Sequence, residues 1–315
     1  MESNEKGSLL VNIARLYYEH NYSQQMIADK LQISRTYVSK LISEALKKGV
    51  VEIKINDPYK SETQVEQDIR AEFKLLKVIA VPSNDTETDV INRVGKATAR
   101  YLNSIIKNDD TIGVAWGNTL YNFSQNIIRR DDLKNITIVQ LCGGISNIEK
   151  NIFASEIPKN IADAYKGTPL ILPLPTLVDN IKVKDAMLKD KNISSILEFA
   201  NKANIAIFTM GPFGYDGALS RAGYINREEV DELIQKGAVG DVCTRIININ
   251  GDICNESLNK RTIAIKLDDL KKKEIRIGVA FGQNRLKCIY GALRGGYANV
   301  LVTDEETAIE LLKLK

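Results

Sequence analysis

Three loops that combine glycine with short polar residues could bind an anion such as a phosphate. Each follows an apolar run typical of a β-strand: the first contains Gly117, Asn118 and Thr119, and the second contains Gly143 and Gly144. The residues of the third loop are Gly282, Gln283, Asn284 and Arg285. Backbone N–H groups at the start of a helix favour a phosphate or carboxylate, and hydroxyl and amide side chains add donors. A single glycine loop is more often a tight turn, but three at one sheet edge predict a small-molecule pocket.

Other polar residues near the same strand ends are candidates for the remainder of such a pocket. Gln140 and Cys142 belong to the second loop. We interpret Cys142 as a small buried hydrophobe rather than a nucleophile, because no base is recognisable beside it. Asp179 and Asp241 could bind sugar hydroxyls or cap local turns, and Arg245 is a further candidate cation.

Catalysis and nucleotide binding find little support. No loop matches a Walker A sequence or GxGxxG. The four cysteines are far apart without CxxC spacing, and the single histidine, His20, reads as a turn residue, so no metal and no cofactor are expected. Only the pair Asp241 and Arg245 deserves a catalytic test, and the alternative function is a sugar-phosphate isomerase or deaminase with a helical leader. The only tryptophan, Trp116, either lines the pocket or fills the core.

The elements that must position these loops alternate between strands and helices from Lys77 onward. Apolar, β-branched runs separated by helical segments predict an α/β domain with a mostly parallel sheet covered on both faces. The predicted strands are KVIAV, TIGVAW, ITIVQL, Leu170–Leu174, IAIFTM, AVGDVCTRIININ, IRIGVAF and NVLVTD. Ligands of such sheets bind beyond the carboxyl ends of the strands. The stretch Val239–Ile265, with a hairpin turn at Asn250-Gly251, is antiparallel in pattern and is expected to be an edge insertion.

A different pattern precedes this domain and predicts a helix-turn-helix over Tyr22–Lys48. Ile27 and Leu31 are spaced as on one helix, and Ser34 is placed to cap a second helix. The apolar face of that second helix consists of Val38, Leu41, Ile42 and Ala45. A third helix, with Leu10, Ile13, Ala14 and Tyr17, is expected to pack across both. Two helices around a tight corner are typical of DNA-binding domains.

The other face of the second helix carries hydroxyls and cations that suit base edges and phosphates. The candidate DNA-binding residues are Ser23, Gln24, Ser34, Arg35, Thr36, Tyr37, Ser39 and Lys40. A small three-helix subdomain with a solvated outer face would show a similar pattern. The tail Gly49-VVEIKI favours DNA binding, because a short strand after the recognition helix begins a wing. The basic balance is modest, so tight binding would need two or more copies.

Length and charge bound the remaining possibilities. The 315 residues suffice for a small domain over 1–57 and a large domain over 58–315, with the boundary at Asn56-Asp57-Pro58. A net charge of +3 does not imply a nucleic-acid partner by itself. No run approaches the ~18 apolar residues of a membrane span, and the start MESNEKGS is not a signal peptide. These features predict a cytoplasmic protein without a membrane partner.

Longer stretches resemble a known family. The segment YYEHNYSQQMIADKLQISRTYVSKLISEALKKGVVEIKI resembles the DNA-binding module of the SorC family of sugar-responsive bacterial transcription regulators. The stretches IGVAWGNTLY, VQLCGGIS, LPLPTLVDN, AVGDVCTRIININGDI and IYGALRGGYANVLVTDEETA resemble its effector domain, in the same order. The most similar branch is that of the deoxyribonucleoside-operon (DeoR-type) regulators. The resemblance implies a Rossmann-like domain similar to sugar-phosphate isomerases but without catalysis, a phosphorylated sugar as effector, and dimers or tetramers on operator DNA.

The resemblance also assigns residues. Gly117, Asn118 and Thr119 match the loop that holds the phosphate. Arg285 stands where relatives usually have lysine, so a planar fork replaces a point charge. Cys142 stands where the deoxyribonucleoside branch has a lysine able to form an imine with an open-chain aldose. A thiol cannot form that imine, so the identity of the sugar is left open.

We therefore expect a transcription regulator of a carbohydrate or nucleoside catabolic operon. A winged helix-turn-helix would bind one operator half-site per protomer, and the α/β domain would hold the copies together. A phosphosugar bound at the sheet edge would change the spacing or orientation of the DNA-binding modules. Repression is expected rather than activation.

Overall fold

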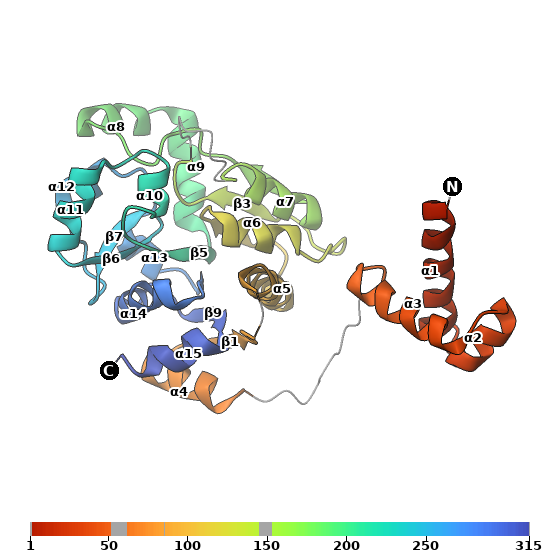
Figure 1. Cartoon of the computed structure of the whole chain (residues 1–315). Helices are drawn as coiled ribbons and strands as arrows, with labels where there is room; N and C mark the ends of the chain where they lie inside the picture. Colours follow the sequence, from red (N-terminus) through yellow and green to blue (C-terminus); the bar gives the residue numbers. More distant parts are fainter. Residues whose placement is uncertain (1, 52–61, 85, 145–152, 315) are drawn as a thin grey trace. The chain divides into compact units, whose positions relative to one another are not determined.

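The computed structural model describes residues 2–51, 62–84, 86–144 and 153–314. The chain forms two compact units, residues 1–61 and 62–315 (Figure 1). The domain boundary expected at Pro58 and most of the strand expected to begin a wing lie outside the described residues. Each unit has a hydrophobic core of its own, and the two are described separately below.

The N-terminal unit is a bundle of three helices, α1 (Glu2–Tyr18), α2 (Gln24–Leu31) and α3 (Arg35–Lys47). Its core contains Ile13, Ile27, Val38 and Leu41, all fully buried. Serine hydroxyls cap both short helices: Ser23 Oγ accepts from the Met26 amide at 3.2 Å. Ser34 Oγ likewise accepts from the Tyr37 amide at 3.2 Å. The helix-turn-helix predicted from these caps and apolar spacings is confirmed.

The large unit is built on a sheet with the strand order β1-β9-β8-β5-β2-β3-β4, all parallel. The strands are β1 (Lys77–Val81), β2 (Thr111–Val114), β3 (Thr137–Gln140), β4 (Thr168–Leu170), β5 (Ile205–Pro212), β8 (Ile275–Val279) and β9 (Val300–Asp304). In β5, the four consecutive residues 205–208 are buried. Because alternate side chains point to opposite faces, both faces of the sheet are covered. The parallel α/β fold predicted from the apolar runs is confirmed.

Helices before and after the strands cover the sheet (Figure 1). The helices include α4 (Gln64–Glu72), α5 (Glu87–Ile105), α6 (Asn118–Gln125), α7 (Glu156–Tyr165), α9 (Lys191–Lys202), α14 (Leu286–Arg294) and α15 (Glu305–Leu312). The others are α8 (Ile181–Leu188), α10 (Ala218–Arg221), α11 (Arg227–Gln235), α12 (Glu256–Arg261), α13 (Leu267–Lys271) and the 3₁₀ turn η1 (Gln283–Arg285). No helix in the described part of the chain is long and apolar enough to cross a membrane.

Two strand predictions were wrong in position. The strand expected over Leu170–Leu174 ends at Leu170 as β4, because Pro173 and Pro175 have no N–H with which to extend a ladder. The antiparallel stretch is not an insertion at the sheet edge. Its first strand, β6 (Ala238–Val242), pairs with residues 210–212 of the central strand β5. It therefore lies alongside the carboxyl-terminal residues of the central strand.

The reversal between β6 and β7 (Arg245–Asn248) occurs at Cys243-Thr244. Both residues have positive φ, 48° and 65°, as a tight two-residue hairpin turn requires. The sequence gives no signal for this turn, since neither residue is Gly, Asn or Asp. The expected turn at Asn250-Gly251 follows β7, where the Asn248 amide donates to Asp252 O at 2.9 Å and Gly251 has a φ of 87°.

Candidate functional site

A pocket of ≈ 320 Å³ lies beyond the carboxyl ends of β2, β5 and β8. These are three neighbouring strands at the centre of the sheet. The lining residues that the sequence predicted are Gly117, Asn118, Thr119, Cys142, Asp241, Asn284 and Arg285. The sequence did not predict the further lining residues Glu87, Ala115, Thr209, Gly211, Pro212, Asp216, Ala218, Arg221, Cys243 and Thr244, and it left the place of Trp116 open.

The first wall of the pocket is the start of α6. Gly117 has a φ of 122° and a ψ of 166°, a conformation that is essentially restricted to glycine. Its backbone turns the chain directly from β2 into the helix, and no side chain caps the helix start. The first N–H groups of α6 are thus available to a ligand, at the positive end of the helix dipole. Thr119 and Asn118 stand at the same position and add hydroxyl and amide donors.

The loop after β8 adds a guanidinium to the pocket lining, that of Arg285. Arg285 Nη1 donates to Phe281 O at 2.8 Å, and the guanidinium carbon stands 5.2 Å from the centre of the Phe281 ring. Burial lowers the pKa of Arg285, while the nearby Glu87 carboxylate raises it. An arginine keeps its proton in proteins, so the pocket holds a fixed positive charge.

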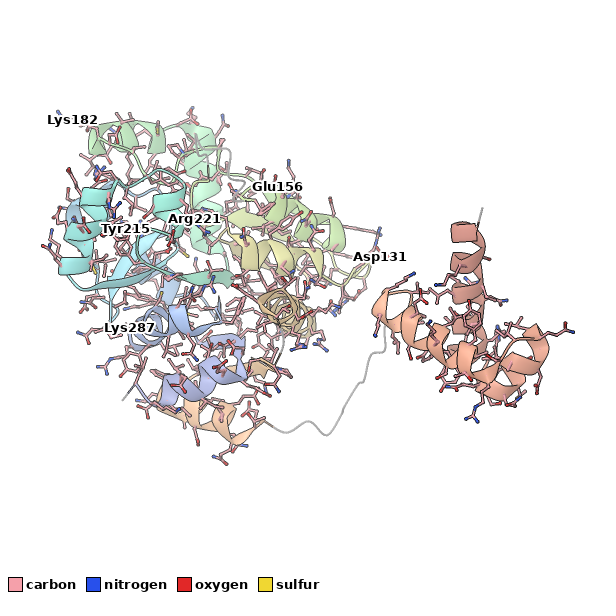
Figure 2. The ribbon with its side chains drawn as sticks, viewed as in Figure 1. Asp131, Glu156, Lys182, Tyr215, Arg221 and Lys287 are labelled. Carbon is pink, nitrogen blue, oxygen red and sulfur yellow. The ribbon has the colours of Figure 1, made fainter. Side chains whose placement is uncertain are left out.

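A second cation, Arg221, lines the pocket. It lies in the segment between β5 and α11 and is labelled in Figure 2. Sequence reasoning missed it, although a signal was present. The loop GPFGYDG at residues 211–217 follows strand IAIFTM as a fourth glycine-rich loop at the same sheet edge. The side chain of Arg221 is exposed, in contrast to that of Arg285, and ends the four-residue helix α10.

Asp241 supplies the main carboxylate of the pocket. Its Oδ2 accepts from the Thr244 amide at 3.0 Å, across the Cys243-Thr244 turn. Burial raises the pKa of Asp241 to about 7, and the Thr244 hydrogen bond only partly opposes this. The carboxyl group can therefore donate as well as accept a hydrogen bond near neutral pH.

The pocket floor is less polar. Cys142 and Cys243 are 1% and 2% exposed, and burial raises the pKa of both thiols. They are uncharged at neutral pH and present small apolar surfaces. Trp116 both lines the pocket and is buried, and its Nε1–H donates to Gly143 O at 2.9 Å. Trp116 thus both lines the pocket and belongs to the hydrophobic core.

Several predicted pocket residues instead build its supports. Gln140 is buried, where its amide donates to Ala154 O and accepts from the Leu172 amide. Gly143 and Gly144 pack so closely against neighbouring segments that a Cβ would collide with residues 174–175 and with Ala154, respectively. These residues shape the wall behind Trp116 rather than the lining.

Arg245 lies outside the pocket lining, and its guanidinium is used elsewhere. It donates to Ile265 O and Ala264 O, each at 2.7 Å, and to Asn259 O at 3.0 Å. Those bonds join β7 to α12 and the segment after it. They occupy the N–H groups with which the guanidinium could otherwise bind a phosphate. Asp241 and Arg245, considered as a catalytic pair, bond to different partners: Asp241 to the Thr244 amide and Arg245 to backbone carbonyls after β7. The cation expected from Arg245 is supplied by Arg221.

The remaining predicted residues lie beside or away from the pocket. Gly282 and Gln283 line a neighbouring cavity of ≈ 330 Å³, which shares Glu87, Asn284 and Arg285 with the first. Asp179 is exposed in the turn before α8 and lines neither cavity. Among the described residues, no group of His, Cys, Asp or Glu side chains is arranged to hold a metal ion.

The N-terminal unit presents a separate polar surface on α3. Arg35, Thr36, Tyr37 and Lys40 are exposed, and Ser39 is partly exposed. The opposite face of the helix, Val38, Leu41, Ile42 and Ala45, is buried against α1 and α2. Of the other candidates, Gln24 is partly exposed on α2, while the Ser23 and Ser34 hydroxyls cap helices.

Comparison with known proteins agrees with this two-part organisation. Residues 57–313 match the Sugar-bind family of sugar-binding domains, and residues 12–48 match sigma-70 region 4. The chain is 40% identical to the deoxyribonucleoside regulator of Bacillus subtilis, over 98% of both chains. It is 30% identical to the sorbitol operon regulator of Klebsiella pneumoniae, over 99% of this chain and 100% of that one. The crystal structure of the full-length Klebsiella protein SorC superposes with a TM-score of 0.81, covering 97% of this chain and 98% of that chain.

A helix-turn-helix joined to a sugar-binding α/β domain defines a transcription regulator with a small-molecule site. The relatives are transcription regulators, so the chain is a regulator and not an enzyme, and the isomerase alternative is set aside. The chain belongs to the SorC family of sugar-responsive bacterial transcription regulators.

Proposed function

We propose that the protein represses a carbohydrate or nucleoside catabolic operon in the bacterial cytoplasm and that a phosphorylated sugar in the ≈ 320 Å³ pocket controls it. The observation that carries the proposal is the convergence of an uncapped helix start and two arginines on one concave site that also contains a carboxyl group. Hydrogen-bond donors and fixed charge at one end suit a phosphate. The Asp241 carboxyl suits sugar hydroxyls.

In this proposal the phosphate binds to the amides at Gly117, Asn118 and Thr119, between Arg285 and Arg221. The helix start and Arg285 are held in place before binding, which reduces the ordering cost. Arg221 is exposed and would close over the phosphate. The sugar then lies over Trp116 and the thiols, with its hydroxyls toward Asp241.

The Cys142 thiol distinguishes the proposed complex from a covalent one. A thiol that stays protonated at neutral pH is a poor nucleophile, and no amine stands at this position to form an imine. Binding at this position is therefore noncovalent. The names of the two relatives, a deoxyribonucleoside regulator and a sorbitol operon regulator, suggest pentose and hexitol phosphates as the first compounds to test.

The experiment follows Trp116 fluorescence and melting temperature in the presence of a panel of phosphates. The panel contains 2-deoxyribose 5-phosphate, ribose 5-phosphate, glucose 6-phosphate and sorbitol 6-phosphate, each with its unphosphorylated parent as the matched control. A ligand at about 100 times its Kd adds about 2.7 kcal/mol of stability and raises the Tm by roughly 5–10 °C. A response to parents and phosphates alike would refute the anion site.

We further propose that α3 reads operator DNA in the major groove through Arg35, Thr36, Tyr37, Ser39 and Lys40. Ser34, Ser23 and Gln24 would contact the backbone or fix the helix starts. Because the reading surface is small and only moderately basic, two or more protomers must bind together, as a homodimer or homotetramer.

The DNA proposal is tested with Arg35→Ala and, as the matched control, Arg15→Ala on α1, where the side chain is also highly exposed. Arg35→Ala should weaken binding to the protein's own promoter at least tenfold at low salt, with effector binding unchanged. Arg15→Ala should bind as the wild type does. Equal effects of the two substitutions would remove α3 from the interface.

A further inference from the structure

The loop that carries Arg285 is tied to the start of α15 by a compact set of buried hydrogen bonds. The Gly282 amide donates to Asp304 Oδ2 at 3.0 Å and to Thr307 Oγ1 at 2.8 Å. The Thr307 amide donates to Asp304 Oδ1 at 2.9 Å, and the Thr307 hydroxyl donates to Asp304 Oδ2 at 2.5 Å. Asp304 and Thr307 are 3% and 1% exposed. The cap of α15 and the beginning of the pocket loop are thus one unit.

Gly282 requires this support because of its conformation. With a φ of 90°, it turns the chain from β8 into η1, and three residues later the chain presents Arg285 to the pocket. Asn284 and Arg285 are shared by both cavities at this edge. A shift at Gly282 therefore moves a pocket cation directly.

The same elements pack against α4, the first helix of the large unit. Helix α4 contacts both α15 and β1, with Ile69 and Leu311 buried in the common core. Glu66 of α4 is also buried, and its Oε1 accepts from the Ala80 amide of β1 at 2.8 Å. The Phe73 ring at the end of α4 meets Tyr290 of α14 edge to face, at 5.7 Å between centres. Helix α14 starts directly after Arg285, so two connections lead from the pocket loop to α4.

Helix α4 stands where the chain enters the large unit, whose first residue is Glu62. Its start is fixed by a capping box between Thr63 and Glu66. Glu62 forms ion pairs with Arg70 at 2.9 Å and with Lys77 at 2.8 Å. The entry point of the chain is therefore joined to the large unit by specific contacts.

We propose that Asp304 and Thr307 are positioning residues for the pocket loop and that, with α15 and α4, they connect the effector cation Arg285 to the point where the chain continues to the helix-turn-helix unit. Ligand binding at Arg285 displaces Gly282, the α15 cap follows through its hydrogen bonds, and α4 responds because it packs on α15. The role of this connection in regulation rests on the proposed effector function. The positioning of the pocket loop by Asp304 and Thr307 can be tested without a ligand.

The test compares Thr307→Val with Thr303→Val in the full chain. Both replace a buried threonine by a residue of the same shape. Thr303 lies on β9 with no exposure, and within the described part of the chain its hydroxyl has no hydrogen-bond partner. Thr307→Val removes both hydrogen bonds of the Thr307 hydroxyl, from the Gly282 amide and to Asp304 Oδ2. It leaves the bonds that the Gly282 and Thr307 amides donate to Asp304. Amide hydrogen exchange is followed by mass spectrometry, with the melting temperature recorded to correct for global stability.

We expect Thr307→Val to speed exchange in residues 281–285, in the first turn of α15 and in α4 by at least about fivefold, the factor that the loss of a single hydrogen bond of ordinary net strength would give. In the Thr307→Val protein, helix α11 should exchange at the wild-type rate. The Thr303→Val protein should exchange at the wild-type rate throughout. The positioning role is overturned if the two variants exchange alike in residues 281–285. The connection to α4 is overturned if that loop changes and α4 does not.

A second readout uses the panel compound that binds the wild type, with inorganic phosphate as the minimal anion. Thr307→Val should weaken its binding and reduce the factor by which it changes operator affinity, while operator affinity without ligand stays unchanged. If the wild type binds no phosphate, the proposed effector fails and the exchange result still decides the positioning role. If the wild type binds and both variants respond equally, the inference fails alone.

Discussion

The most informative perturbation is the removal of the Asp241 charge by Asp241→Asn. Asp241 lines the pocket with one hydrogen bond, from the Thr244 amide, and burial raises its pKa from 3.8 to about 7. A carboxyl group whose pKa is higher in the folded protein binds more protons there. Its ionisation therefore destabilises the fold as the pH rises from about 4 to about 7. Asparagine has nearly the same shape as aspartate and keeps an oxygen that can accept from the Thr244 amide. Because it does not ionise, it avoids the loss of stability that ionisation of Asp241 causes.

The magnitude follows from the size of the shift. A rise from 3.8 to about 7 corresponds to about 4 kcal/mol once the group is fully ionised, as an upper value. At pH 5 the wild type has already lost roughly 1.5 kcal/mol through this group. The stability advantage of Asp241→Asn should therefore grow by about 2–3 kcal/mol between pH 5 and pH 8.5. Most of the growth should occur below pH 7.

The assay is urea unfolding of the ligand-free protein at half-unit pH intervals from 5 to 8.5. The matched control is Asp216→Asn, since Asp216 also lines the pocket but is exposed. It shows the effect of the same amide substitution at an exposed position of the pocket. A difference for Asp241→Asn that is constant across this range would show that the carboxyl group ionises normally, and the account of the pocket as a poorly solvated site would be wrong.

Three further substitutions test separate features. Gly117→Ala should weaken binding of the active phosphate at least tenfold in a fluorescence titration, because a side chain strains a backbone φ of 122° even though open space surrounds it. The control is Gly237→Ala, which is strained in the same way at a φ of 84° but lies away from the pocket and should leave binding unchanged. Thr244→Gly should raise the free energy of unfolding by about 1 kcal/mol in urea, because a β-branched residue there has a φ of 65°, and a loss instead would show that its side chain matters more than the turn. Lys273→Met should lower the unfolding free energy by roughly 1–3 kcal/mol, since the buried ammonium donates to Ala200 O at 2.9 Å at the end of α9, and an unchanged Tm would contradict this role.

The pocket could be predicted from the sequence only in part. Gly117 and Arg285 are recognisable because each stands in a loop directly after an apolar strand, and parallel strands bring such loops to one edge. Arg221 follows a glycine-rich loop of the same kind, but the seven residues of that loop and a short helix separate it from the obvious motif. Arg245 was the more conspicuous cation in sequence, yet its strand turns the guanidinium toward backbone carbonyls.

Local interactions explain which features the sequence by itself determined. The helix-turn-helix depends on Ser23, Ser34 and apolar residues three or four apart, and each of these acts within one or two turns of its own helix. The alternation of strands and helices is likewise written in short apolar runs. Membership of the SorC family followed from collinear stretches and is confirmed.

Only the tertiary structure decided which polar groups face the pocket and which are used as supports. The Cys243-Thr244 turn places Asp241 beside Gly211 because β6 pairs with the end of β5, a contact between segments about thirty residues apart. The junction of Gly282 with Asp304 and Thr307 joins the ends of two parallel strands. Such contacts depend on the register and packing of distant segments, and no pattern within a single segment encodes them.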